Sequence, residues 1–244
     1  MSFGGLKAVH EVDLDVPAGK ITTIIGPNGA GKTTFFNLVS GFYSPTTGRI
    51  VLDGEDVTGL PPHQVARRGV ARTFQTTRLF PEATVLDNVI VGRRLHTRSN
   101  VFDAVLRSGR HRREAEECRA KALEALDFTG TRDLADVPVA SISQEARKRV
   151  AIALALATEP RLLLLDEPAA GINLHETDGL CALIRALVQR GITVCLVEHK
   201  MRMVMDLSDH VAVLNHGKKI AEGTPDEIRR NPTVIDAYLG ADHG

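Results

Sequence analysis

Residues 26–34 read Gly-Pro-Asn-Gly-Ala-Gly-Lys-Thr-Thr, and the interpretation of the whole chain starts from them. The stretch matches the pattern G-x-x-x-x-G-K-[ST], with a strand-like run at 21–25 before it and a helix-like run at 34–39 after it. Glycines let the backbone wrap a triphosphate with its N–H groups pointing inward, and the following helix turns the positive end of its dipole toward the same anion. The alternative is a glycine-rich turn before an ordinary helix, but the flanking strand and helix favour a phosphate site.

Chemistry assigns roles within this phosphate loop. The Lys32 ammonium would reach the β- and γ-phosphates of a nucleotide, and the Thr33 hydroxyl would hold Mg²⁺. The residues predicted to bind the nucleotide here are Gly26, Pro27, Asn28, Gly29, Ala30, Gly31, Lys32, Thr33 and Thr34.

Composition excludes several classes of protein. Thirty basic and thirty acidic side chains leave the 244 residues with a formal charge of zero, so no bulk field attracts nucleic acid or an anionic membrane. We therefore expect no nucleic-acid partner. The longest apolar runs, at 150–157 and 162–165, are far shorter than the roughly 18 residues that suggest a membrane span, and the N-terminus lacks a secretion signal.

The cysteines indicate neither a disulfide framework nor a zinc site. Cys118, Cys181 and Cys195 are odd in number and show no C-x-x-C spacing. A soluble protein in a reducing, cytoplasmic environment fits this pattern best.

The segment before the phosphate loop predicts a β-hairpin. Apolar residues alternate at Val12, Leu14 and Val16, and residues 17–20 (Pro-Ala-Gly-Lys) read as a turn into the next strand. Phe3 is one of few aromatic residues, and its ring would either stack on an adenine or cover the sheet edge. Position alone favours the sheet edge.

The rest of the chain predicts an α/β core interrupted by helices. From 76 to 159, apolar residues recur at helical spacing in the runs 86–91, 101–106 and 113–126, which predicts a mostly helical insertion. Elsewhere, strand-like runs alternate with helix-like ones, and a hairpin precedes two short helices that begin near Pro225 and Pro232. The strand-like runs lie at 49–54, 70–74, 161–165 and 193–197, the helix-like ones at 61–67 and 175–189, and the hairpin at 210–222.

Polar residues follow several of these strands. Asp166 and Glu167 come directly after four leucines, where two carboxylates are costly unless something needs them. Ligands gather at the carboxyl ends of strands in open α/β sheets, so we expect this pair near the phosphate loop. Gln75 and His199 also follow strand-like runs. An exposed surface residue is the commoner alternative for Gln75, and position alone leaves His199 undecided between a functional and a capped residue.

Taken together, the phosphate loop, Gln75, the acidic pair, the run Pro-Ala-Ala-Gly-Ile-Asn at 168–173 and His199 occur in an order that resembles the ATP-binding subunits of ABC transporters. The resemblance covers essentially the whole chain. It implies one α/β ABC ATPase domain, in which residues 1–75 and 160–244 form a P-loop NTPase (RecA-like) core with an antiparallel β subdomain. Residues 76–159 would form an inserted helical lobe.

The resemblance also implies partners and a location. ABC ATPase subunits pair head to tail around two ATP molecules and couple Mg-ATP hydrolysis to solute movement through integral membrane permease subunits. We therefore expect this chain to be cytoplasmic and peripheral on the inner face of the cell membrane, with ATP and Mg²⁺ as cofactors.

Site roles follow from the same resemblance. Asp166 is the expected Mg²⁺ ligand, Glu167 polarises the attacking water, and His199 contacts the γ-phosphate. Gln75 links Mg²⁺ to the membrane partner, and Phe3 stacks on the adenine. These roles agree with the residue chemistry, because phosphoryl transfer needs charge stabilisation around the γ-phosphate and one group that orients water. Glu167 is free to act as general base because Asp166 is committed to the metal.

Weaker signs resemble the branched-chain amino acid importers. They are Gly-Leu-Lys-Ala-Val at 5–9, Ala-Arg-Thr-Phe-Gln at 71–75, Pro-Ala-Ala-Gly-Ile-Asn at 168–173 and Asn-Pro-Thr-Val-Ile-Asp-Ala-Tyr-Leu-Gly at 231–240. The extended region 100–113 is similar to the longer of that system's two ATPase subunits. Related importers carry urea, amides or other amino acids, so the likeness alone implies the substrate.

Two features depart from the family pattern. The strand-forming residues that such subunits carry before Phe3 are missing, so we expect a loose adenine platform or a truncated N-terminus. The signature, near L-S-G-G-Q in the family, reads Ile-Ser-Gln-Glu-Ala at 142–146. It keeps Ser143, the expected contact to the opposite subunit's ATP, but Glu145 replaces a glycine. A carboxylate about 5 Å from phosphate oxygens is unfavourable by roughly 3 kcal/mol per unit charge at an effective dielectric of about 20.

The altered signature leaves two interpretations open. Residues 141–144 could simply form a capping box that opens the helix to Ala157. Alternatively, the chain's own ATP site, with the phosphate loop, Asp166, Glu167 and His199, is complete, while its altered signature would complete the ATP site of a partner subunit poorly. This second interpretation favours a heterodimer with another ATPase subunit over a homodimer, and it predicts that Glu145→Gly with Ala146→Gln raises turnover. The rival function is an ATP-dependent dimerisation or binding module with little turnover.

Overall fold

Three isoleucines and two threonines build the central strand of the fold. In the computed structural model, which describes residues 1–3, 6–73, 79–93 and 109–239, β3 (Ile21–Ile25) is buried along its whole length. Burial on both faces is expected of a parallel strand inside an α/β sheet. β3 pairs in parallel with β8 (Thr193–Val197) on one side and with β9 (His210–Asn215) on the other.

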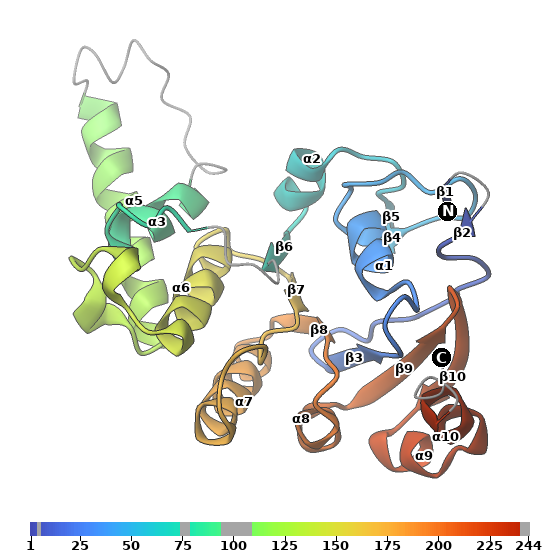
Figure 1. Cartoon of the computed structure of the whole chain (residues 1–244). Helices are drawn as coiled ribbons and strands as arrows, with labels where there is room; N and C mark the ends of the chain where they lie inside the picture. Colours follow the sequence, from blue (N-terminus) through green and yellow to red (C-terminus); the bar gives the residue numbers. More distant parts are fainter. Residues whose placement is uncertain (4–5, 74–78, 94–108, 240–244) are drawn as a thin grey trace. The chain divides into compact units, whose positions relative to one another are not determined.

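Six strands form one sheet in the order β10-β9-β3-β8-β7-β6 (Figure 1). β6 (Val70–Thr73), β7 (Leu162–Asp166) and β8 are parallel neighbours, whereas β10 (Lys218–Gly223) forms an antiparallel hairpin with β9. Parallel strands end at the same edge of a sheet, so β3, β6, β7 and β8 deliver the residues that follow them to one place. The predicted α/β class is confirmed.

Helices enclose the core of this sheet. α1 (Lys32–Val39) follows β3 and buries Phe36 completely, and α2 (Pro62–Arg67) contributes Val65 to the same cluster. α7 (Leu174–Gln189) and α8 (Met201–Leu207) precede β8 and β9, and α9 (Pro225–Arg230) and α10 (Pro232–Leu239) pack on β10. The buried cluster under α1 comprises Ile24, Ala30, Phe36, Val65, Val70, Leu162, Leu164, Cys195, Val197 and Leu214.

The hairpin predicted before the phosphate loop is wrong. Residues 8–20 contain no strand, and Val12, Leu14 and Val16 pack against the α1 cluster from irregular backbone. Both edges of β3 are already taken by β8 and β9, so no hydrogen-bonding edge remains for a preceding strand.

Two very short hairpins lie outside the main sheet. β1 (Ser2–Phe3) pairs with β2 (Leu6–Lys7), and β4 (Val51–Leu52) pairs with β5 (Glu55–Asp56). The strand predicted at 49–54 is therefore shorter than expected. Asp53 and Gly54 have φ angles of 48° and 83°, which suits the tight two-residue turn between β4 and β5.

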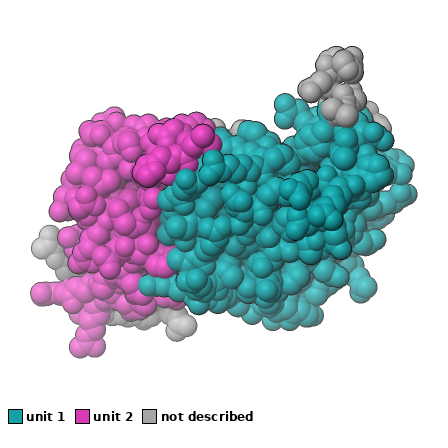
Figure 2. All heavy atoms as spheres, turned by 90° about the horizontal axis from the view of Figure 1, so that it is seen from below, with its two compact units in different colours: residues 1–75, 161–170, 177–244 teal, residues 76–160, 171–176 magenta. Residues whose placement is uncertain are grey.

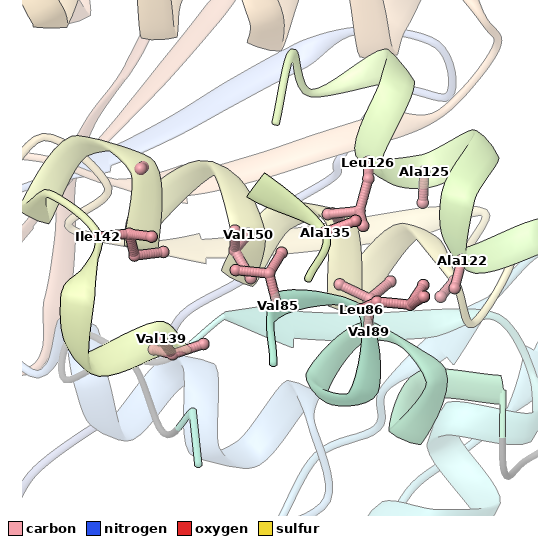
Figure 3. Close-up of a cluster of buried hydrophobic side chains, with 13 residues drawn as sticks. Val85, Leu86, Val89, Ala122, Ala125, Leu126, Ala135, Val139, Ile142 and Val150 are labelled. Atoms are coloured by element: carbon pink, nitrogen blue, oxygen red, sulfur yellow. The ribbon is translucent and has the colours of Figure 1, made fainter. Parts of the chain in front are cut away.

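A separate group of helices has its own core. α3 (Val85–Gly92), α5 (Gly109–Phe128) and α6 (Gln144–Leu156), with 3₁₀ turns at Arg132–Leu134 and Val139–Ser141, surround the side chains shown in Figure 3. Val85, Val89, Leu126 and Val150 are fully buried there. The helical run predicted at 101–106 lies outside the described residues.

The chain divides into two compact units, which Figure 2 colours separately. The first comprises residues 1–75, 161–170 and 177–244, and the second comprises 76–160 and 171–176. Within the part of the chain that the structure describes, no helix has the length and apolar character needed to cross a membrane.

Candidate functional site

The phosphate loop connects the buried end of β3 to the first turn of α1. Gly26, Gly29 and Gly31 all have positive φ angles, of 152°, 80° and 100°, and this backbone conformation suits glycine. A side chain at Gly26 would also meet the carbonyl oxygen of Leu214 at 2.1 Å. The glycines of the pattern are therefore required by the backbone path of the loop and by the neighbouring strand β9.

The N-terminus of α1 offers its backbone N–H groups to a ligand. Gly31 is the N-cap residue and makes no side-chain cap, so the first N–H groups of the helix are not satisfied by a capping side chain. Thr33 and the loop residues Asn28 and Gly29 are exposed, whereas Ala30 is buried. An anion at this position would meet both the N–H groups and the positive end of the helix dipole.

Lys32 is buried and its side chain hydrogen-bonds to the backbone of the phosphate loop. Its Nζ donates hydrogen bonds to the carbonyl oxygens of Gly26 at 2.7 Å and Pro27 at 2.9 Å, and the residue is only 8% exposed. Burial lowers the pKa of Lys32, and the negative charges of Glu167 and Asp166 oppose that shift. Ile24 and Asp166 both lie opposite Val197, so the loop that follows β3 and the acidic pair lie at the same edge of the sheet.

Asp166 is buried at the end of β7 and paired with Arg72. The distance from Arg72 Nη2 to Asp166 Oδ2 is 2.8 Å, and both side chains are 5% exposed. Arg72 Nη1 also donates to Asn37 Oδ1 at 2.7 Å and to Ser40 Oγ at 3.0 Å, both on or next to α1. The guanidinium lies over the Phe36 ring, 5.5 Å from its centroid. Arg72 therefore connects the helix of the phosphate loop to the acidic strand.

Sequence reasoning did not single out Arg72. The signal was available, because a single arginine that directly follows the apolar residues Val70 and Ala71 of a predicted strand needs a partner where its side chain is buried. Which carboxylate it meets depends on the pairing of β6 with β7, in which Arg72 lies opposite Leu164.

Glu167 and His199 come from neighbouring strand ends. Glu167 has a φ angle of 47°, a left-handed conformation that is uncommon for glutamate, and its N–H donates to the Val197 carbonyl at 2.9 Å. His199 follows β8, is exposed, and its Nδ1 lies 3.9 Å from Glu167 Oε2. The parallel sheet thus brings these two predicted site residues together.

Oxygen donors suitable for Mg²⁺ are present at this edge of the sheet. The exposed Thr33 hydroxyl and the Asp166 carboxylate are the ligand types that Mg²⁺ prefers. Among the described residues, no group of three or more His, Cys, Asp or Glu side chains could hold a metal by itself. The donor set therefore fits an ion that takes its remaining ligands from nucleotide phosphates and water.

Ser143 and Glu145 belong to the second unit and lie at the start of α6. Ser143, not Ser141, is the N-cap, and its Oγ accepts from the Ala146 N–H at 3.1 Å. The capping box considered at 141–144 is therefore wrong in register. The Arg149 side chain donates to Glu145 Oε1 and, at 3.2 Å, to the Thr129 carbonyl, so the carboxylate that departs from the family pattern has a cationic partner.

Two predicted site residues cannot be placed. Gln75 lies outside the described residues, and for Phe3 the structure describes the backbone in β1 and not the side chain. Their expected contacts with Mg²⁺ and adenine stay predictions.

Comparisons with known proteins identify relatives over nearly the whole chain. The ABC transporter family matches residues 9–170, and the branched-chain amino acid ATP-binding cassette transporter family matches residues 218–244. BraF of Pseudomonas aeruginosa, a high-affinity branched-chain amino acid transport ATP-binding protein, is 46% identical over 241 residues, which cover 98% of this chain and 94% of BraF. LivG of Escherichia coli K12, which carries the same description, is 44% identical with the same coverage.

Solved structures of ATP-binding cassettes also match this chain. An ATP-binding cassette of an ABC transporter in its ADP conformation matches with a TM-score of 0.86 at 31% identity, covering 98% of this chain and 95% of that one. A dimeric, post-hydrolysis cassette bound to ADP and Pi matches with a TM-score of 0.75 at 26% identity, covering 89% and 90%.

Proposed function

This chain belongs to the ABC transporter family of ATP-binding cassettes, and from that premise we propose that it is the ATPase subunit of an importer for branched-chain or related amino acids. The match of residues 218–244 to the branched-chain family and the names of BraF and LivG support the substrate class. One observation carries the ATPase part: Ile24, Val197 and Asp166 lie in register across β3, β8 and β7, so the phosphate loop, His199 and Glu167 follow strand ends at one edge of the sheet.

The proposed reaction divides the work among residues of the first unit. The N–H groups at the start of α1 and the Lys32 ammonium bind the β- and γ-phosphates of ATP. Glu167 takes a proton from the attacking water, and the neighbouring His199 donates to the γ-phosphate. Thr33 and Asp166 would hold Mg²⁺, which supplies positive charge to the phosphates when it is bound. Gln75, Phe3 and Ser143 would complete the contacts to the metal, the adenine and the opposite subunit's ATP.

The same proposal covers domains, partners and location. Residues 1–75 and 160–244 would act as the nucleotide-binding core, and residues 76–159 as the helical lobe. Integral membrane permease subunits and a second ATPase subunit would complete the transporter, with a heterodimer favoured because of Glu145. The chain would then be peripheral on the inner, cytoplasmic face of the cell membrane.

The rival function, a binding module with little turnover, loses support because the Glu145 carboxylate has a cationic partner. Arg149 pairs with this carboxylate along the same helix face, so part of the negative charge that argued against turnover is offset. Glu167 and His199 also lie close together, as a hydrolytic site requires.

The experiment that tests the proposal combines binding with hydrolysis. We expect Mg-ATP to bind the wild-type chain by calorimetry, and Lys32→Ala to weaken binding by about 100-fold, because a buried charged partner of the phosphates is lost. Lys20→Ala is the matched control, since Lys20 is an exposed lysine paired with Asp209. Equal binding by wild type and Lys32→Ala would refute the assigned site.

The solute requires the assembled transporter. Purification of the chain from its native membranes should bring permease subunits and any second ATPase subunit with it. ATP hydrolysis by this complex in proteoliposomes should rise when leucine, isoleucine or valine and their binding component are supplied. Stimulation by urea or amides in place of these amino acids would reassign the solute without affecting the ATPase assignment.

A further inference from the structure

Glu198 is a completely buried carboxylate beside the candidate catalytic residues. It is 0% exposed and follows β8, immediately before His199. Its Oε2 accepts hydrogen bonds from the N–H groups of His199 at 2.8 Å and Lys200 at 3.1 Å. One oxygen of this side chain therefore fixes the backbone that carries the histidine.

The other oxygen of Glu198 reaches a different segment of the first unit. Glu198 Oε1 accepts from the N–H of Ala169 at 3.0 Å, two residues after Glu167. Ala169 itself is fully buried. A single side chain thus joins the segment that follows Glu167 to the segment that carries His199.

The Glu167 segment needs such support because its backbone conformation is unfavourable. Glu167 has a φ angle of 47°, and conformations of this kind persist only where surrounding contacts enforce them. The N–H of Glu167 donates to the Val197 carbonyl at 2.9 Å, and the Ala170 N–H donates back to the Glu167 carbonyl at 3.1 Å. The bond from Ala169 to Glu198 is the third contact that closes this turn, and it is the one contact of the three that a side chain supplies.

A carboxylate suits this position better than any other side chain. Three N–H donors converge on two oxygens, and an ionised carboxylate accepts at both oxygens while donating at neither. A glutamine has the same shape, but its NH₂ group would face at least one of the backbone N–H donors. Burial of the charge is otherwise costly, which indicates that the backbone contacts compensate for it.

We propose that Glu198 is a positioning residue for ATP hydrolysis. By binding the backbone N–H groups of Ala169, His199 and Lys200, it holds Glu167 and His199 at a fixed separation. The separation concerned is the 3.9 Å between Glu167 Oε2 and His199 Nδ1. This inference rests on the proposed function. The hydrogen bonds of Glu198 go to backbone N–H groups, and its Oε2 also lies 3.9 Å from His199 Nδ1, so Glu198 acts on the reaction through other residues of the protein.

The test is the substitution Glu198→Gln, with the rate and the binding of Mg-ATP measured separately. We expect kcat to fall roughly 10- to 100-fold, because small displacements of catalytic groups reduce rates by such factors. The dissociation constant for Mg-ATP should stay within about threefold of wild type, because the phosphate loop is not altered. A purely structural role would instead lower the affinity for Mg-ATP along with kcat.

Glu227→Gln is the matched control. Glu227 also accepts a backbone N–H, that of Thr224 at 2.7 Å, but it lies in the exposed capping box of α9. This control should retain wild-type kcat. If Glu198→Gln does not fold, Glu198→Asp, which keeps the charge with a shorter reach, is judged by the same criteria.

The outcomes separate this inference from the proposed function. If the wild-type complex hydrolyses ATP and Glu198→Gln has kcat within about twofold of it, the positioning role is wrong and the proposed function stands. A parallel loss of kcat and Mg-ATP affinity in Glu198→Gln also overturns the positioning role. If the wild-type complex hydrolyses no ATP, the proposed function itself is wrong.

Discussion

Arg72 shows how one side chain can determine whether a functional carboxylate is tolerated in a core. The Asp166 side chain is 5% exposed, and a buried carboxylate without a partner costs several kcal/mol. The guanidinium satisfies it at 2.8 Å and at the same time contacts Asn37, Ser40 and the Phe36 ring. The planar fork of arginine makes these simultaneous contacts possible, and a lysine ammonium could make only some of them.

We predict that Arg72→Met lowers the free energy of unfolding by about 3–5 kcal/mol, since it leaves the Asp166 charge buried and unpaired. Arg72→Lys should lose less, because the charge is kept. Chemical denaturation measures both values. The control is Arg202→Met, whose pair with Asp206 is exposed on both sides and should cost at most about 1 kcal/mol. Equal effects of Arg72→Met and Arg202→Met would contradict the importance of the buried pair.

At the scale of single elements, two different constraints exclude a side chain from glycines of the phosphate loop: a positive φ angle and a steric clash with a neighbouring strand. A Cβ at Gly26 would lie 2.1 Å from the Leu214 carbonyl oxygen, whereas a Cβ at Gly29 would meet nothing within 4 Å. Both have positive φ angles, so both substitutions cost backbone strain, but only Gly26 also faces a rigid neighbouring strand.

Gly26→Ala should therefore destabilise the protein by several kcal/mol more than Gly29→Ala, for which we expect about 1 kcal/mol. Thermal unfolding of the two variants, without nucleotide, measures the difference. If both variants unfold at the same temperature, the backbone of β9 can move away and the steric argument fails.

The N-terminus of α6 is the second element with a measurable consequence. Ala146 is buried in the core of the helical unit, so the substitution Ala146→Gln considered from sequence would place a larger polar side chain in that core. Glu145→Gly alone is the better test, because Glu145 is only partly buried and its removal leaves the Arg149 charge in place.

We predict that Glu145→Gly raises the ATP turnover of a homodimer by about tenfold, which corresponds to less than half of the roughly 3 kcal/mol expected for an unpaired charge. Steady-state phosphate release measures it. Glu124→Gly, on the exposed face of α5 and paired with Lys121, controls for a new glycine and a lost charge in a helix. Unchanged turnover in Glu145→Gly would show that the altered signature does not limit hydrolysis.

For the whole molecule, the central prediction is that nucleotide binding stabilises the fold. Mg-ATP at about 100 times its dissociation constant should add roughly 2.7 kcal/mol to the free energy of unfolding. For a chain of this size that amounts to a rise in Tm of roughly 5–10 °C. Differential scanning fluorimetry measures the rise, and Lys32→Ala, with about 100-fold weaker binding, should reduce it to about 1 °C at the same Mg-ATP concentration. A rise of the same size in Lys32→Ala would place the binding site elsewhere.

Much of this architecture could be predicted from local sequence. The phosphate loop is defined by glycines and a lysine at fixed spacing, and the run of leucines before Asp166 identifies a strand buried on both faces. The elements α2, α7, β8 and the β9–β10 hairpin lie within a residue or two of their predicted positions, because each is set by the pattern of its own residues. These features are local, so the sequence alone determined them and with them the α/β class.

Other features depend on contacts between segments that are distant in the sequence, and only the tertiary structure decided them. The apolar alternation at Val12, Leu14 and Val16 resembles a strand, but β3 offers no free edge, so the segment forms no strand and packs from irregular backbone. Arg72 meets Asp166, and Glu198 meets Ala169, because parallel strands bring residues from distant parts of the chain to one edge. Periodicity tells which faces are buried, but strand order decides which buried polar groups meet, and that order is a property of the assembled sheet.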